Sequence, residues 1–65
     1  MKNHVKELRQ QFDLSQNALG ELVGVSRQTI NSLEKGRYNP SITLAFKLSK
    51  VFNRPIEDIF IYEEE

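Results

Sequence analysis

The sequence predicts an all-α fold, a bundle of five short helices with one short strand near the end of the chain. Three observations lead to this prediction. Apolar residues recur at three- and four-residue intervals, as they do along one face of a helix. Serines stand where these patterns begin, and glycines or Asn-Pro stand where they end. Only the tail "IFIYEEE" has an extended pattern, because β-branched and aromatic residues precede a run of acids.

Length and composition indicate one small domain, residues 1–65. A chain of this size buries only about 60% of the surface that it exposes when unfolded, so it depends on tight packing or on a partner chain. With no cysteine, and with His4 as the sole histidine, neither disulfides nor a structural zinc site is expected. No apolar run approaches the roughly 18–20 residues that span a bilayer, and no signal peptide is visible. We therefore expect a cytoplasmic protein without cofactors.

Charges are segregated along the chain although the formal net charge is zero. All nine lysines and arginines lie between Lys2 and Arg54, whereas five of the nine acids lie in the last nine residues. Between Ser26 and Arg54 there are six bases and a single acid, Glu34. This distribution indicates an anionic partner for the middle of the chain.

The first two helices are separated by a capped turn. The spacing of the apolar residues predicts the first helix over about residues 3–11. The second begins after Ser15, whose hydroxyl can accept a free backbone N–H. Leu14 before this cap can pack on Leu19 after it, and Gly24 ends the helix because glycine adopts the left-handed conformation easily.

The same arrangement recurs eleven residues later and defines a helix-turn-helix over about residues 15–35. Ser26 caps the third helix, Val25 can pack on Ile30, and Gly36 ends it. Two helices of about two turns each, joined by a turn that contains glycine, form the helix-turn-helix pattern.

The rest of the chain is predicted as two further helices and a strand. After the turn at Asn39-Pro40, Ser41 is expected to cap a fourth helix over about residues 42–52. Pro55 suits the first turn of a short fifth helix over residues 55–60. A strand over residues 61–63 would follow, and residues 1–3 are a candidate for its partner strand.

One face of the third helix is rich in side chains that can recognise nucleic acid. Residues 27, 28, 31, 32 and 35 fall on the same exposed face of a helix. Arginine, glutamine and asparagine match the edges of guanine and adenine in the major groove. The candidate base-reading residues are Arg27, Gln28, Asn31 and Ser32. The candidates for contacts to the DNA backbone are Gln16, Lys35, Arg37, Tyr38 and Asn39. The alternative, an ordinary solvated helix face, stays open.

The segment "LSQNALGELVGVSRQTINSLEKGRYNPSITLAFKLSKVF" resembles the lambda-repressor-like, Cro-type helix-turn-helix family of DNA-binding proteins. It is most similar to small stand-alone regulators of the cytolysin-repressor type, and the resemblance covers almost the whole chain. Its most specific parts are Leu14-Ser15-Gln16, Val23-Gly24-Val25-Ser26, Ile30, Leu33-Glu34-Lys35-Gly36 and Asn39-Pro40-Ser41. The resemblance implies that the third helix enters the major groove and that the residues assigned above contact double-stranded DNA.

The resemblance also implies a structural ion pair between Arg9 and Glu34, because the matching glutamate of the family points back to the first helix. The alternative is two independent surface charges. The chain departs from the family at three positions, one of which is Ala18, where a glutamate is common. Gly20 replaces a usual alanine, which would allow close approach by the third helix, and Asp13 replaces a frequent glycine but tolerates the left-handed conformation.

The end of the chain, residues 55–65, is the candidate dimerisation segment. One short helix reads too few base pairs alone, so proteins of this kind bind paired half-sites. The candidate interface residues are Ile56, Ile59, Phe60, Ile61 and Tyr62. Similarity to cytolysin-repressor-like homodimers with a small sheet near their termini supports this assignment. The alternative is that Ile59 and Phe60 close the core of the monomer. The acids at residues 63–65 are interpreted as a solvated tail.

The sequence thus predicts a sequence-specific transcriptional regulator, a repressor that binds a palindromic operator as a homodimer. The alternative is an antitoxin-like or accessory protein-interaction module built on the same fold. No small-molecule ligand is evident. Enzyme activity is not expected, because Ser15 and Ser26 are explained as caps and no paired carboxylates or phosphate-binding glycine loop appears.

Overall fold

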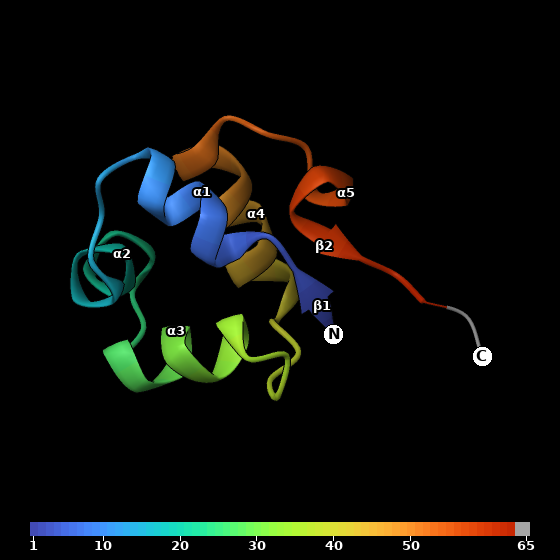
Figure 1. Ribbon diagram of the computed structural model, residues 1–65, viewed down its shortest axis with the longest axis horizontal. Helices are drawn as coiled ribbons and strands as arrows, with labels where there is room; N and C mark the ends of the chain where they lie inside the picture. Colours follow the sequence, from blue (N-terminus) through green and yellow to red (C-terminus); the bar gives the residue numbers. More distant parts are fainter. Residues whose placement is uncertain (64–65) are drawn as a thin grey trace.

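The computed structural model describes residues 1–63, so residues 64–65 of the acidic tail predicted at 63–65 lie outside the described residues. The elements in chain order are β1 (Lys2–Asn3), α1 (Val5–Gln11), α2 (Gln16–Val23), α3 (Arg27–Glu34), α4 (Ile42–Phe52), α5 (Ile56–Ile59) and β2 (Phe60–Ile61). In Figure 1, α3 runs along the lower edge of the molecule, with α1 and α4 above it. The β1–β2 sheet and α5 lie together at the right-hand end. The five predicted helices are all present.

Three serine caps fix where the longer helices begin. The hydroxyls of Ser15, Ser26 and Ser41 accept the backbone N–H three residues ahead, at 3.0, 3.1 and 3.1 Å. Each serine has extended backbone angles, as an N-cap requires. These local contacts explain why the starts of α2, α3 and α4 agree with the sequence prediction.

The turn between α2 and α3 is held by two glycines. Gly24 ends α2 with a φ of 78°, and the N–H of Val25 donates to the carbonyl of Gly20 at 2.9 Å. A Cβ atom on Gly20 would lie 2.5 Å from the Val25 carbonyl oxygen. The predicted close approach at Gly20 therefore exists, but it comes from the backbone of the turn and not from α3 itself. Asp13 adopts a φ of 56°, the left-handed conformation expected for it.

The two ends of the described chain pair with each other, and here the predicted boundaries were wrong. α1 begins at Val5, because Asn3 belongs to β1. β2 is Phe60–Ile61, whereas the predicted strand covered residues 61–63. The strand begins one residue early because Phe60 already has extended angles (φ −112°, ψ 139°), and α5 is therefore Ile56–Ile59 and not residues 55–60. The two strands are antiparallel, with Lys2 opposite Ile61 and Asn3 opposite Phe60. The small sheet is thus formed within one chain.

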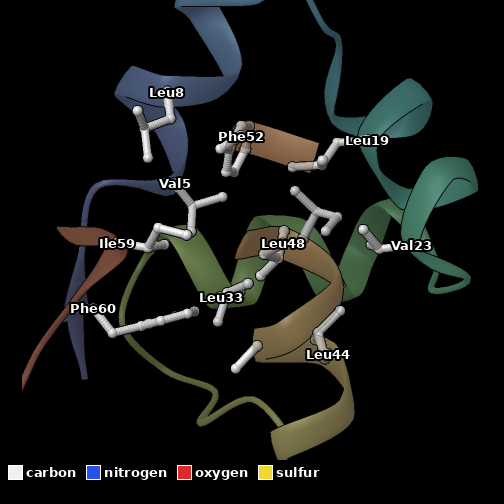
Figure 2. Packing of buried hydrophobic residues seen from close by; sticks show 12 residues of the cluster. Val5, Leu8, Leu19, Val23, Leu33, Leu44, Leu48, Phe52, Ile59 and Phe60 are labelled. Carbon is white, nitrogen blue, oxygen red and sulfur yellow. The ribbon is translucent and has the colours of Figure 1, made fainter. Parts of the chain in front are cut away.

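All five helices contribute to a single apolar core (Figure 2). Its buried members are Val5, Leu8, Leu19, Val23, Ile30, Leu33, Leu44, Ala45, Leu48, Phe52, Ile59 and Phe60. Phe52 of α4 is the largest fully buried side chain, and its ring meets the half-exposed ring of Phe12 edge-on at 5.6 Å. Because Ile30 and Leu33 are fully buried, the core holds α3 by one face and leaves the opposite face for other contacts.

Candidate nucleic-acid interface

The face of α3 that points away from the core is polar and slightly hollow. Arg27 and Gln28 are exposed, whereas Asn31 and Ser32 are half-buried. Together with Gln16 at the start of α2, these four side chains line a depression of about 400 Å³. None of the five is acidic, so the surface offers hydrogen-bond donors, acceptors and positive charge. The structure therefore brings the four candidate base-reading residues together on one surface.

Glu34 is kept off this surface by Arg9 of α1. Arg9 Nε donates to Glu34 Oε2 at 2.7 Å, and Arg9 Nη2 donates to Glu34 Oε1 at 3.3 Å. The third donor, Nη1, is used by the carbonyl of Leu14 at 2.8 Å. The side chains of Arg9 and Glu34 are only 13% and 5% exposed. The expected ion pair is thus present, and it is largely shielded from water.

Gln16 connects the ion pair to the polar face of α3 formed by Arg27, Gln28, Asn31 and Ser32, which we call the reading face after its predicted role. Its Nε2 donates to Glu34 Oε1 at 3.1 Å, and its Oε1 accepts from Asn31 Nδ2 at 3.4 Å. The sequence predicted Gln16 only as a contact to the DNA backbone. In the structure, Gln16 also bridges a buried carboxylate, Glu34, and a candidate base-reading amide, Asn31.

A second, smaller hollow of about 210 Å³ continues the surface past the ion pair. It is lined by Gln16, Asn31 and Glu34, and by three basic residues, Lys6, Arg9 and Lys35. Lys6 was missed in the sequence analysis. Its position three residues before Arg9 on α1 was the available indication, because residues at this spacing share a helix face. Lys6 and Lys35 place positive charge on this side of the reading face.

The remaining candidates for backbone contacts lie beyond the end of α3. Arg37, Tyr38 and Asn39 are exposed and line neither of these two hollows. Asn39 instead accepts a hydrogen bond from the Met1 nitrogen through Oδ1 at 3.4 Å. It also lines a depression of about 280 Å³ at the end of the molecule formed by the termini. Asn39 therefore contacts the N-terminal end of the chain and not the reading face.

An apolar surface lies where the two ends of the described chain meet. We call it the terminal apolar surface, and it is formed by Met1, Ile42, Ile56, Phe60, Ile61 and Tyr62. Ile61 and Tyr62 are 37% and 76% exposed. Phe60 is almost wholly buried within its own chain, and Ile59 is fully buried. Ile59 can therefore only support this surface from beneath, as the monomer-core alternative expects.

Across residues 1–63, no group of three or more His, Cys, Asp or Glu side chains could hold a metal ion. Over the same range, none of the helices combines the length and the apolar character that crossing a membrane requires.

Comparison with known proteins assigns the family. Residues 5–59 match the family described as Helix-turn-helix. An HTH-type transcriptional regulator of Archaeoglobus fulgidus is 54% identical over 65 residues, which are 100% of this chain and 92% of that protein. The HTH-type transcriptional regulator YgzD of Bacillus subtilis is 57% identical over 65 residues, again 100% of this chain and 98% of the relative.

A solved structure agrees with these sequence matches. The restriction-modification controller protein C.AhdI of Aeromonas hydrophila superposes with a TM-score of 0.78 and 30% sequence identity. The match covers 88% of this chain and 86% of that protein. Together with the serine-capped α2–α3 pair and the Arg9–Glu34 ion pair, these matches show that the chain belongs to the lambda-repressor-like helix-turn-helix family of DNA-binding proteins.

Proposed function

We propose that this protein is a sequence-specific transcriptional repressor, which binds a palindromic operator as a homodimer with α3 in the major groove. Membership of the helix-turn-helix family and the names of its relatives support the coarser part, DNA-binding regulation of transcription. The observation that carries the finer part is the exposed face of α3. It joins Arg27, Gln28 and Asn31 on one acid-free surface, and these side-chain types recognise guanine and adenine.

The homodimer is supported by the size of the reading element and by the terminal apolar surface. α3 has eight residues, so it is only about 12 Å long and reaches a few base pairs. Two copies, each reading one half-site about 34 Å apart, supply the missing affinity and specificity. Exposed Ile42, Ile61 and Tyr62 provide apolar area that a second copy would cover.

The terminal apolar surface is also connected to α3, which a dimer of defined spacing requires. Asn3 Nδ2 of β1 donates to the Leu33 carbonyl at 2.8 Å, and the Met1 nitrogen donates to the Gly36 carbonyl at 3.0 Å. Pairing two copies through this end would therefore fix the separation of the two α3 helices. Repression follows as the simplest outcome, because a bound dimer blocks a promoter by occupancy alone, whereas activation also needs a contact with the polymerase.

Selection of bound duplexes from a random DNA pool tests this proposal. We expect an inverted repeat whose half-sites are separated by about one helical turn. A reporter gene placed behind the selected site should then be expressed less when the protein is present. Enrichment of no sequence, or of a single unrepeated half-site, would contradict the proposal.

The exposed Ile61 and Tyr62 also suit a second function, a module that binds another protein. The dependence of binding affinity on salt concentration distinguishes the two functions. Binding to DNA through several lysines and arginines releases counterions and weakens steeply as salt rises, whereas an apolar protein interface does not.

A further inference from the structure

A continuous chain of hydrogen-bonded side chains runs from α1 to the reading face of α3. It begins at Arg9, passes to Glu34 at 2.7 Å, to Gln16 at 3.1 Å, and ends at Asn31 at 3.4 Å. Arg9 and Glu34 are shielded from water, whereas Gln16 and Asn31 line the hollow on the reading face. A buried charge is thus connected, through Gln16, to a candidate base-reading amide.

Each hydrogen bond in this chain has only one possible direction from donor to acceptor, which we call its polarity. The guanidinium of Arg9 can only donate hydrogen bonds, and the ionised carboxylate of Glu34 can only accept them. Gln16 must therefore turn its NH2 group toward Glu34, which leaves its oxygen toward Asn31. Asn31 must in turn present its own NH2 group to Gln16. The Asn31 oxygen, Oδ1, is then the end of the amide directed away from Gln16.

We propose that Glu34 is a positioning residue that, through Gln16, selects the base that Asn31 reads. This inference rests on the proposed function, since it requires α3 to read base edges. An asparagine with Oδ1 and one N–H free pairs with adenine, which offers the N6 donor and the N7 acceptor side by side. Guanine offers only the acceptors O6 and N7 there, so it cannot satisfy Oδ1. The structure therefore assigns adenine to Asn31.

Glu34 acts on the base without touching DNA. Its side chain is 5% exposed and is occupied on both oxygens, by Arg9 Nε on Oε2 and by Arg9 Nη2 and Gln16 on Oε1. A change at Glu34 therefore reaches the groove only through the orientation of the amides of Gln16 and Asn31. The direction of these hydrogen bonds can therefore be changed without changing any contact to DNA. Substitutions that preserve side-chain shape test the inference.

The substitution Glu34→Gln reverses the polarity of the chain. Arg9 still requires an acceptor, so the new amide turns its oxygen to Arg9 and its NH2 group to Gln16. Gln16 must then rotate and present its own NH2 group to Asn31, whose Oδ1 becomes the acceptor and whose two N–H groups face the groove. Selection from a random pool should then replace adenine at one position of each half-site by a base with acceptors, guanine or thymine, with a change in preference of roughly fivefold or more.

The double substitution Gln16→Glu with Glu34→Gln restores the original polarity. The carboxylate at position 16 accepts from both neighbours, so Asn31 again presents its NH2 group to position 16 and its Oδ1 to the groove. Adenine preference should return at that position, although affinity for all sequences falls because a carboxylate now lies near phosphates. A purely structural role of Glu34 does not predict this return.

Glu21→Gln is the matched control, because Glu21 also accepts from a side-chain amide, Asn17 Nδ2 at 3.2 Å, but on an exposed part of α2. It should leave the selected sequence unchanged. Thermal unfolding by circular dichroism checks that each variant is folded. If Glu34→Gln is unfolded, Gln16→Met removes the link while leaving Arg9 and Glu34 unchanged. It should weaken the adenine preference at that position, because Asn31 can then turn either end of its amide to the groove.

Two results would overturn the inference: adenine preference as strong as in the unsubstituted protein in folded Glu34→Gln or Gln16→Met, or an altered preference that the double variant does not restore. Failure of the proposed function gives a different result, because the unsubstituted protein itself would then enrich no sequence.

Discussion

The reading face of α3 and the terminal apolar surface are held in place by different kinds of contact. On the reading face, side chains from three helices hold one another, and the central ion pair is 13% and 5% exposed. At the terminal end, backbone pairing of β1 with β2 supplies the order, and the ion pair there, Lys2–Glu63 at 3.6 Å, is 72% and 57% exposed.

If the proposed function holds, this difference separates two tasks. Recognition of bases would need side chains held in one orientation, as the shielded polar contacts hold them. Association with a second copy would need apolar area and would tolerate exposed charges at its margin. Asn3 joins the two regions, because its side chain bonds both the Leu33 carbonyl at the end of α3 and the Val5 N–H at the start of α1.

The largest difference between the regions should appear in their ion pairs. Arg9→Ala leaves the shielded Glu34 carboxylate without its charged partner, so we expect a loss of about 3–5 kcal/mol in the free energy of unfolding. Lys2→Ala is the matched change at the exposed pair and should cost at most about 1 kcal/mol. Urea unfolding followed by circular dichroism measures both. Similar losses for the two variants would remove this distinction.

Charge on the terminal apolar surface should prevent association. Ile61→Asp removes the 37% of Ile61 that an interface could still bury, at about 25 cal/mol for each Å² of apolar area, and brings two carboxylates into the proposed interface. Light scattering should therefore report a monomer in place of a dimer. Phe46→Asp is the control, since Phe46 is a 56% exposed apolar residue of α4 outside this surface. An unchanged dimer mass for Ile61→Asp would locate the interface elsewhere.

Removal of a base-reading side chain should affect only specific binding. Gln28→Ala is expected to cost about 1–3 kcal/mol at the selected operator and to relax preference at one position. Fluorescence anisotropy with operator and with random duplex measures both effects. An equal loss on random DNA would mean that Gln28 contacts the backbone and does not read bases.

The smallest effect is expected at a single phosphate contact. Lys35→Ala should weaken binding to all sequences alike and reduce the slope of log K against log salt by about 0.9 for each phosphate that the protein no longer neutralises. Lys50→Ala is the control, because Lys50 lies in the last turn of α4, at the end of that helix distant from α3 (Figure 1). If Lys35→Ala has the same slope as the unsubstituted protein, Lys35 does not contact the DNA backbone.

Local features of the fold were predictable from the sequence, and long-range ones were less so. Ser15, Ser26 and Ser41 act on residues only three positions away, so each helix start was visible in a short window. Arg9 and Glu34 lie 25 residues apart, and their pairing was predicted through family resemblance. The pairing of Asn3 with Phe60 placed β2 one residue earlier than predicted, because strand register depends on contacts between distant segments.

In the candidate site, too, local features were predictable from the sequence and long-range contacts were not. The periodicity of α3 placed Arg27, Gln28 and Asn31 on one face, because helical spacing is a local property. It could not show that Gln16 bonds both Glu34 and Asn31, or that Lys6 and Lys35 line one hollow. These contacts depend on how α1 and α2 pack against α3, and a single sequence does not specify that packing.

Titration of the ¹⁵N-labelled protein with the selected operator, followed by NMR, tests the central claim most directly. The largest shift changes should fall on the side-chain amides of Gln28 and Asn31 and on the backbone of Arg27 and Ser32, and a scrambled duplex should not reproduce them. Changes centred on Ile61 and Tyr62, with the signals of α3 unmoved, would contradict the claim that α3 reads the bases.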